Sequence, residues 1–125
     1  MVLTDEYFYN LVKKILKSYD IMKNLQDSKD DLYVLDVELL KINGLLKVLQ
    51  RKSEEFVEKN PNFSKLQKKI KLYFENYYFI EELEKIKDVY SEDPLRIKNI
   101  KNSIITSLEN DKLIYLIGDF SKSLK

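Results

Sequence analysis

The chain has 125 residues, a formal net charge of +1 and no histidine, cysteine or tryptophan. This length fits one domain, residues 1–125, which can bury a hydrophobic core without disulfides or metal. Without His and Cys the chain cannot build a Ser-His or Cys-His nucleophile pair, a zinc site with nitrogen or sulfur ligands, or an iron–sulfur cluster. We therefore expect a protein that is not an enzyme and has no catalytic residue, metal or cofactor.

Charge and hydropathy patterning restrict the location and the partners. Acidic and basic residues are interspersed along the chain without a charged tail, which argues against a dedicated nucleic-acid coat or a membrane-surface helix. No uncharged apolar stretch approaches membrane-spanning length, and residues 1–6 lack the pattern of a signal peptide. The sequence thus predicts a cytoplasmic protein with no membrane partner.

Two long amphipathic helices are expected first. The first begins at Thr4, which can cap it, and runs to about Gln26. Ser28 followed by Asp31 resembles a capping box that starts the second helix, so the connection is short and the pair is antiparallel. The apolar stripe of the first helix contains Phe8, Leu11, Val12, Ile15, Tyr19, Met22 and Leu25.

The second helix carries a heptad seam and is expected to be the long central helix of the bundle. Pro61 ends it, and Gly44 in its middle predicts either close packing of another backbone or a mild bend. A second apolar line on this helix contains Val34, Val37, Leu45 and Val48. The seam contains Leu32, Leu35, Leu39, Ile42, Leu46, Leu49 and Phe56. The spacing leaves open whether the seam closes within one chain or between two copies.

Three further helices complete the predicted fold. The third starts near Asn62 and runs to Tyr90, with an apolar stripe that drifts in phase. The fourth starts at Asp93 and Pro94, because Asp is a good cap and Pro suits the first helical position. A loss of phase at residues 110–111 separates a short last helix. The chain is thus expected to be all-α, an antiparallel bundle of four helices plus a short C-terminal helix.

An aromatic segment in the third helix is the first candidate site. Neighbouring residues on a helix point to different sides, so these rings cannot all enter one core, and some are expected to bind a partner protein. The alternative is that Tyr73 and Tyr77 belong to the core. The segment consists of Tyr73, Phe74, Tyr77, Tyr78 and Phe79.

Lysines just before this segment are an alternative candidate, a nucleic-acid interface. Cations combined with aromatic stacking surfaces are typical of proteins that bind single strands. The simpler interpretation is a solvated lysine face, because arginine, the better phosphate ligand, is scarce. The four lysines are Lys65, Lys68, Lys69 and Lys71, with Tyr73, Tyr77 and Tyr78 as the stacking rings.

A run of carboxylates, Glu54, Glu55 and Glu58, offers the one enzymatic alternative. Such an E-E-x-x-E run can ligate Mg²⁺ when a second helix adds acids. It resembles half of the signature of the all-helical nucleoside-triphosphate pyrophosphohydrolases of the MazG type, and the resemblance implies magnesium-dependent pyrophosphohydrolysis. The other half, E-x-x-D, is not met. The nearest match ends at Asp88, one residue too far from Glu84, which turns a ligand by about 100° on a helix. Surface salt bridges are the simpler interpretation of these acids.

The stretch from Lys47 to Leu108 is similar in helix order to the YlbF and YmcA group of bacterial helical adaptor proteins, which act in RNA-processing complexes and biofilm regulation. The similarity is one of shape. This chain departs from the group at Asp93 and Pro94, which interrupt a helix that is continuous in the group.

These features together predict a non-catalytic protein–protein interaction module. A regulator, an inhibitor carried by a phage, virus or other mobile element, or a small structural subunit would all suit the chain. The expected partner is another protein, and the amount of apolar stripe on the second and third helices also predicts a homo-oligomer. The first alternative is a nucleic-acid-binding helical protein, and the second is the magnesium-dependent pyrophosphohydrolase.

Overall fold

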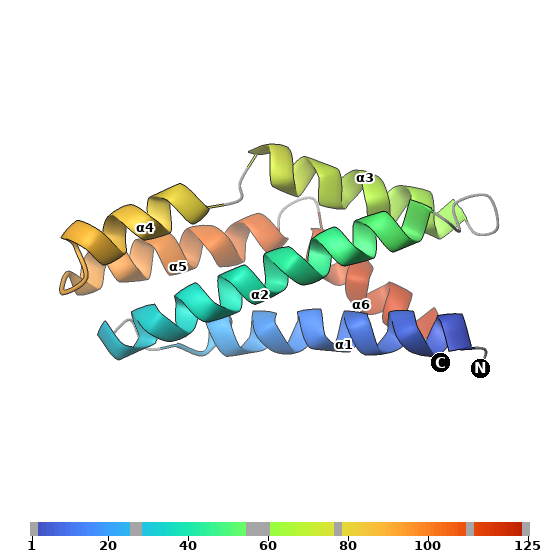
Figure 1. Cartoon of the computed structure of the whole chain (residues 1–125), viewed down its shortest axis with the longest axis horizontal. Coiled ribbons are helices and arrows are strands. Elements are labelled where there is room, and N and C mark those ends of the chain that lie inside the picture. The colour runs from blue at the N-terminus through green and yellow to red at the C-terminus, as the bar shows by residue number, and fades with distance from the viewer. Residues whose placement is uncertain (1–2, 26–28, 55–60, 77–78, 110–111, 124–125) are drawn as a thin grey trace.

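The computed structural model describes residues 3–25, 29–54, 61–76, 79–109 and 112–123, and within them the chain forms six helices and no strand (Figure 1). The helices are α1 (Leu3–Lys23), α2 (Lys29–Ser53), α3 (Pro61–Asn76), α4 (Ile80–Val89), α5 (Pro94–Glu109) and α6 (Leu113–Ser123). The predicted all-α helical bundle is confirmed. None of the described helices is long and apolar enough to span a membrane.

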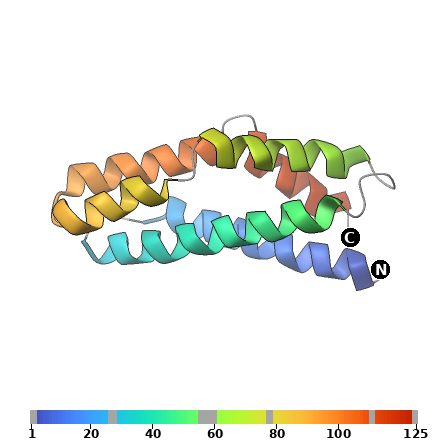
Figure 2. The same cartoon turned by 45° about the horizontal axis from the view of Figure 1, so that its top comes forward.

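The six helices form an elongated bundle of four rods. The helices α1 and α2 are an antiparallel pair, α3 and α4 follow one another along a third rod, and α5 and α6 form the fourth (Figures 1 and 2). The helix α1 contacts α2, α5 and α6, whereas α2 contacts α1, α3, α4 and α5. The predicted antiparallel arrangement of the first two helices is therefore present.

The heptad seam of α2 closes inside this one chain. Its members are buried and face the apolar stripe of α1 together with residues of the other rods. The described seam residues are Leu32, Leu35, Leu39, Ile42, Leu46 and Leu49, and they join Leu66, Ile70, Leu83, Ile97, Ile104, Leu108 and Ile117 in one core. Phe56 lies outside the described residues. The seam is thus used for folding and is not available to a second molecule.

The predicted third helix, from Asn62 to Tyr90, is wrong in one respect, because the structure divides it into α3 and α4. Phe79 precedes α4 in a left-handed conformation with φ of 59° and ψ of 1°. In one continuous helix, Leu83 would point about 80° away from the direction of Tyr73. The break re-aims α4, so that both side chains enter the core.

The expected start of the next helix is confirmed. Pro94 is the first residue of α5, and the Oδ1 atom of Asp93 accepts hydrogen bonds from the backbone N–H groups of Leu95 at 3.1 Å and Arg96 at 3.3 Å. These bonds satisfy donors that an α-helix leaves free in its first turn.

Gly44 does not fulfil the expectation of close packing. A Cβ atom added to this residue would meet no atom within 4 Å, apart from the chain neighbours and helix backbone beside it. The residue is exposed in the middle of α2, where glycine costs about 1 kcal/mol relative to alanine. Packing within the described chain therefore gives no reason for a glycine here.

Candidate functional site

The described rings of the predicted aromatic segment pack inside the molecule. Tyr73 is only 2% exposed, and its hydroxyl donates a hydrogen bond of 2.8 Å to Oδ1 of Asn43 on α2. Phe74 and Phe79 are partly buried and pack against the core. Tyr73 therefore belongs to the core, as the alternative interpretation held, and does not present its ring to a partner. Tyr77 and Tyr78 lie outside the described residues.

A row of exposed apolar side chains lies instead on the outward side of α2. Tyr33 is 67% exposed, Val37 56% and Leu40 55%. They recur at steps of four and three residues, and the same spacing continues through Gly44, Lys47 and Arg51. We call this set, Tyr33, Val37, Leu40, Gly44, Lys47 and Arg51, the outward stripe. All six residues are exposed.

The packing of α2 explains why this side stays uncovered. On one flank, Ser18 of α1 donates a hydrogen bond to the buried Glu38 of α2. On the other flank, α3 and α4 are tied to α2 by the bond from Tyr73 to Asn43 and by an ion pair of 2.9 Å between Lys87 and Asp36. With the seam facing inward, the remaining side faces solvent, and no helix lies in front of α2 in Figure 1.

Sequence reasoning placed Val37 with Val34, Leu45 and Val48 in a second apolar line and therefore made α2 a helix covered on more than one side. In the structure Leu45 and Val48 pack against the core, whereas Val34 and Val37 are exposed. The spacing of Tyr33, Val37 and Leu40 was visible in the sequence as a second series of steps of four and three. This series marks the outward stripe, but the sequence alone does not show which of the two series the other helices cover.

Two polar clusters hold α1 in place. The Ser18 hydroxyl lies 2.5 Å from Oε2 of Glu38, which is 6% exposed, and Lys41 approaches Oε1 of the same carboxylate at 3.3 Å. The Tyr19 hydroxyl donates to Oε2 of Glu109 on α5 at 2.6 Å. Burial, followed by this hydrogen bond, raises the pKa of Tyr19 above its ordinary value. These groups join α1 to α2 and α5, and Ser18 and Lys41 also line a pocket between α1 and α2.

Lysines of the predicted nucleic-acid interface divide between two sides of α3. Lys65 and Lys69 line a groove of about 210 Å³ between α3 and α6, together with Lys112, Tyr115, Leu116 and Asp119. Lys68 and Lys71 are exposed elsewhere on α3, and Lys71 approaches Glu75 at 4.0 Å. The groove thus combines three lysines with the exposed ring of Tyr115. Sequence reasoning missed Tyr115, because only the fold brings α6 beside α3.

The structure does not bring the described carboxylates of the pyrophosphohydrolase interpretation together. Glu54 follows the C-terminal end of α2, whereas Glu84 on α4 shares Lys87 with Asp36 near the start of α2. Asp36 and Glu54 are 18 positions apart, about 27 Å along a helix axis. Among the described residues no group of three acidic side chains could hold a metal ion. Glu55 and Glu58 lie outside this set.

The ion pair that joins α4 to α2 favours the charged form of its lysine. The Lys87 ammonium contacts Oδ2 of Asp36 at 2.9 Å and Oε1 of Glu84 at 3.1 Å. The bond to Asp36, followed by that to Glu84, raises the pKa of Lys87 above its ordinary value. The lysine therefore acts as a cation that positions α4.

No protein family, curated protein or solved structure that was compared matches this chain. Its role must therefore be inferred from the chemistry of its own surface.

Proposed function

We propose that this protein is a non-catalytic interaction module of the cytoplasm that binds a helix of a polypeptide through the outward stripe. The observation that supports this proposal is the alignment of Tyr33, Val37 and Leu40 on one uncovered side of α2. Single exposed apolar residues are normal on a protein surface, whereas a contiguous row is typical of an interaction site.

The shape of the stripe favours a helical partner. Side chains at steps of three and four residues form a line along a helix, and such a line packs against the matching line of another helix. Covering the three apolar side chains removes them from water, which contributes about 25 cal/mol per Å² of apolar surface. Arg51 at the other end is suited to an acidic residue of the partner. The ammonium of Lys47 lies 5.5 Å from the centroid of the Phe74 ring on α3.

The test is capture of a partner by the tagged full chain from an extract of the cells that produce it. Leu40→Glu places a charge in the stripe and should abolish capture. Leu95→Glu is the matched control, because Leu95 is 65% exposed and belongs to another helix, α5. Capture that survives Leu40→Glu would contradict the proposal, as would failure of the wild-type chain to retain any polypeptide, itself included.

A second candidate function, binding of single-stranded nucleic acid, is favoured by one observation. The groove between α3 and α6 combines Lys65, Lys69 and Lys112 with the exposed Tyr115. Lysines can neutralise phosphates while a tyrosine ring stacks on a base, and stacking contributes about 1 to 3 kcal/mol per base.

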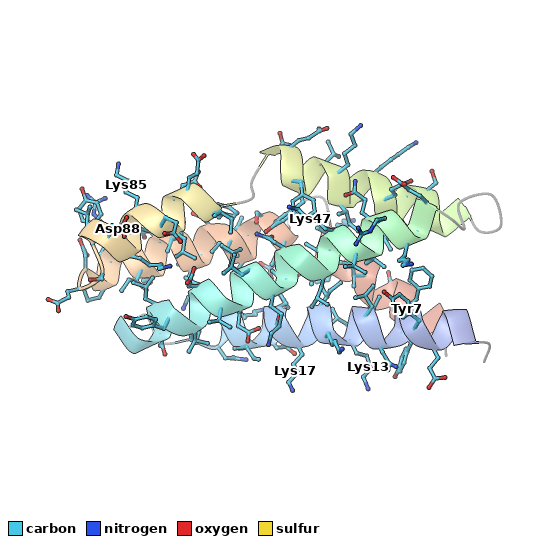
Figure 3. The ribbon with its side chains drawn as sticks, in the orientation of Figure 1. Tyr7, Lys13, Lys17, Lys47, Lys85 and Asp88 are labelled. Atoms are coloured by element: carbon cyan, nitrogen blue, oxygen red, sulfur yellow. The ribbon has the colours of Figure 1, made fainter. Side chains whose placement is uncertain are left out.

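Salt dependence separates this candidate from protein binding. If the groove binds a fluorescent single-stranded oligonucleotide, the logarithm of the affinity falls with the logarithm of salt, with a slope of about −0.7 for each phosphate contacted. Lys65→Gln and Lys69→Gln should reduce that slope. Lys13→Gln and Lys17→Gln are controls, because both lysines are exposed on α1 and neither lines the groove between α3 and α6 (Figure 3). Affinity that does not change with salt would eliminate the candidate.

A further inference from the structure

We propose that the partner of the outward stripe is a second copy of this chain, with the two α2 helices antiparallel and centred at the level of residue 42. The inference deepens the proposed function and rests on it. Three properties of the stripe carry it: its spacing, its chemistry from end to end, and its glycine.

The spacing of the stripe reads the same in both directions. Its six positions, 33, 37, 40, 44, 47 and 51, are separated by steps of four, three, four, three and four residues. A twofold axis at the level of residue 42 therefore brings every position of one copy opposite a position of the other. Position 33 faces 51, 37 faces 47, and 40 faces 44. A twofold axis requires such self-matching of one surface.

The two halves of the stripe are chemically complementary in this register. The N-terminal half is bulky and apolar, whereas the C-terminal half is a glycine followed by two cations. The Lys47 ammonium lies 5.5 Å from the centroid of the Phe74 ring of its own chain. Its methylene stem can cover apolar surface, and in the pair it lies against Val37 of the second copy. The ring of Tyr33 faces the guanidinium of Arg51, which is a favourable cation–π pair.

Charge supports the same orientation. Asp88 of α4 lines a pocket together with Tyr33, so an exposed carboxylate lies beside the apolar end of the stripe. Figure 3 shows Asp88 near the end of α4 and Lys47 farther along α2. In the antiparallel pair, Arg51 of the second copy comes to the end that carries Asp88. A parallel pair would instead place both cationic halves side by side, which is repulsive.

The antiparallel pair explains why position 44 is a glycine. It is exposed, and an added Cβ would meet no neighbouring atom, so packing within the described chain does not require glycine. In the pair it lies opposite Leu40 of the second copy. A position without a side chain lets the two backbones approach and receives the bulky leucine, as small residues do where helices cross closely.

Sedimentation equilibrium of the full chain tests the association. We expect a dimer for the wild type, and an increase of the dimer dissociation constant of at least about tenfold for Leu40→Glu, since the change occurs twice in a symmetric pair. Gly44→Leu should also weaken the dimer by at least about tenfold, although leucine favours the helix. Leu95→Glu should leave the dimer intact, and circular dichroism verifies that each variant is folded.

Disulfide crosslinking tests the register, because the chain has no cysteine of its own. A mixture of Leu40→Cys and Gly44→Cys chains should form a mixed disulfide on mild oxidation. Val37→Cys chains should not crosslink to one another, because the two positions would be about 15 Å apart along the axes. Disulfides need Cα atoms within about 7 Å.

The outcomes distinguish the inference from the function on which it rests. A wild-type chain that stays monomeric overturns the self-pairing, while the proposed function stands if Leu40→Glu still abolishes capture of a different polypeptide. Strong crosslinking of Val37→Cys chains overturns the register. If Leu40→Glu and Gly44→Leu leave the dimer unchanged, the outward stripe is not the dimer interface. A dimer lost in both variants, together with the mixed disulfide, supports the whole proposal.

Discussion

At the scale of single residues, buried polar contacts between helices fix which side of α2 faces each neighbour. Glu38 reaches Ser18 of α1, while Asn43 reaches Tyr73 of α3. All four of these residues are buried. A buried polar group that loses its partner costs far more than an exposed one, so such contacts oppose rotation of α2 about its axis.

Ser18→Ala should lower the free energy of unfolding by about 1 to 3 kcal/mol, because it removes a hydrogen-bond donor from a buried carboxylate. Ser107→Ala is the matched control. Ser107 is also buried on a helix, but its hydroxyl bonds to the carbonyl of Ile104 in the same helix, so its loss should cost less than about 0.5 kcal/mol. Urea denaturation measures both values. Equal losses in the two variants would contradict a special role for the pair of Ser18 and Glu38.

Stability should fall as the pH rises in the alkaline range. The chain has no His or Cys, so we expect nearly constant stability between about pH 6 and 9. The pKa values of Tyr19, Lys23 and Lys87 are all raised in the folded chain. The native state therefore binds more protons than the unfolded state above about pH 10, and stability falls as the pH rises further.

Tyr19→Phe should make this alkaline fall shallower, because it removes the phenol and with it the oxygen that accepts a hydrogen bond from Lys23, a bond that raises the pKa of the lysine. Glu109→Gln should have an intermediate effect, since burial, the main cause of the shift at Tyr19, remains. Urea denaturation at several pH values compares the variants with the wild type. A fall of unchanged steepness in Tyr19→Phe would show that other groups control it.

At the scale of elements, two of the four rods are broken at residues in the left-handed conformation. Phe79 precedes α4 with φ of 59°, and Lys112 precedes α6 with φ of 61°. Residues other than glycine pay about 1 to 2 kcal/mol for this conformation. The packing of Phe79 against the core opposes this cost. The breaks let each rod change direction, which a straight helix with a drifting apolar stripe could not do.

Asp93→Ala should lower the free energy of unfolding by about 0.5 to 2 kcal/mol, because it removes the side-chain cap of α5. Asp93→Asn is the matched control. An asparagine oxygen can accept the same bonds from Leu95 and Arg96, so the loss should be limited to the weak, exposed ion pair with Arg96. Thermal or urea unfolding measures the difference. Similar losses in the alanine and asparagine variants would show that the cap bonds contribute little.

At the scale of the whole molecule, the four rods are held together unequally. The pair of α1 and α2 contributes most of the apolar stripe of one helix and the six described seam residues of the other. By contrast, α4 has ten residues and a single fully buried side chain, Leu83. Local stability follows buried apolar contact, so the bundle should open first at α4.

Native-state hydrogen exchange should therefore show the least protection in α4 and the greatest in the middle of α1 and α2. Lys87→Met should increase exchange in α4 selectively, because it removes the cation that joins Asp36 and Glu84. Lys98→Met on the exposed side of α5 is the control. Exchange of the α4 amides only by global unfolding of the bundle would contradict the expected order of opening.

The sequence by itself determined the helical class, most of the helices and most of the core, although it did not show the break between α3 and α4. The periodicity of Leu32, Leu35 and Leu39, the cap at Asp93 and the proline after it are local signals, because a helix repeats every 3.6 residues and its first turn needs acceptors. For the same reason the stripe of α1 could be assigned without knowledge of its neighbours.

Only the tertiary structure decided which helix faces stay exposed and which residues, distant in the sequence, lie side by side. Val37 and Leu45 look alike in the sequence, yet Leu45 lies beside Ser18 of α1 and packs against the core, whereas Val37 is exposed. The groove of Lys65 and Tyr115 joins residues 50 positions apart in the sequence. Exposure depends on where the other rods lie, and those positions follow from the sum of all core contacts rather than from any one segment.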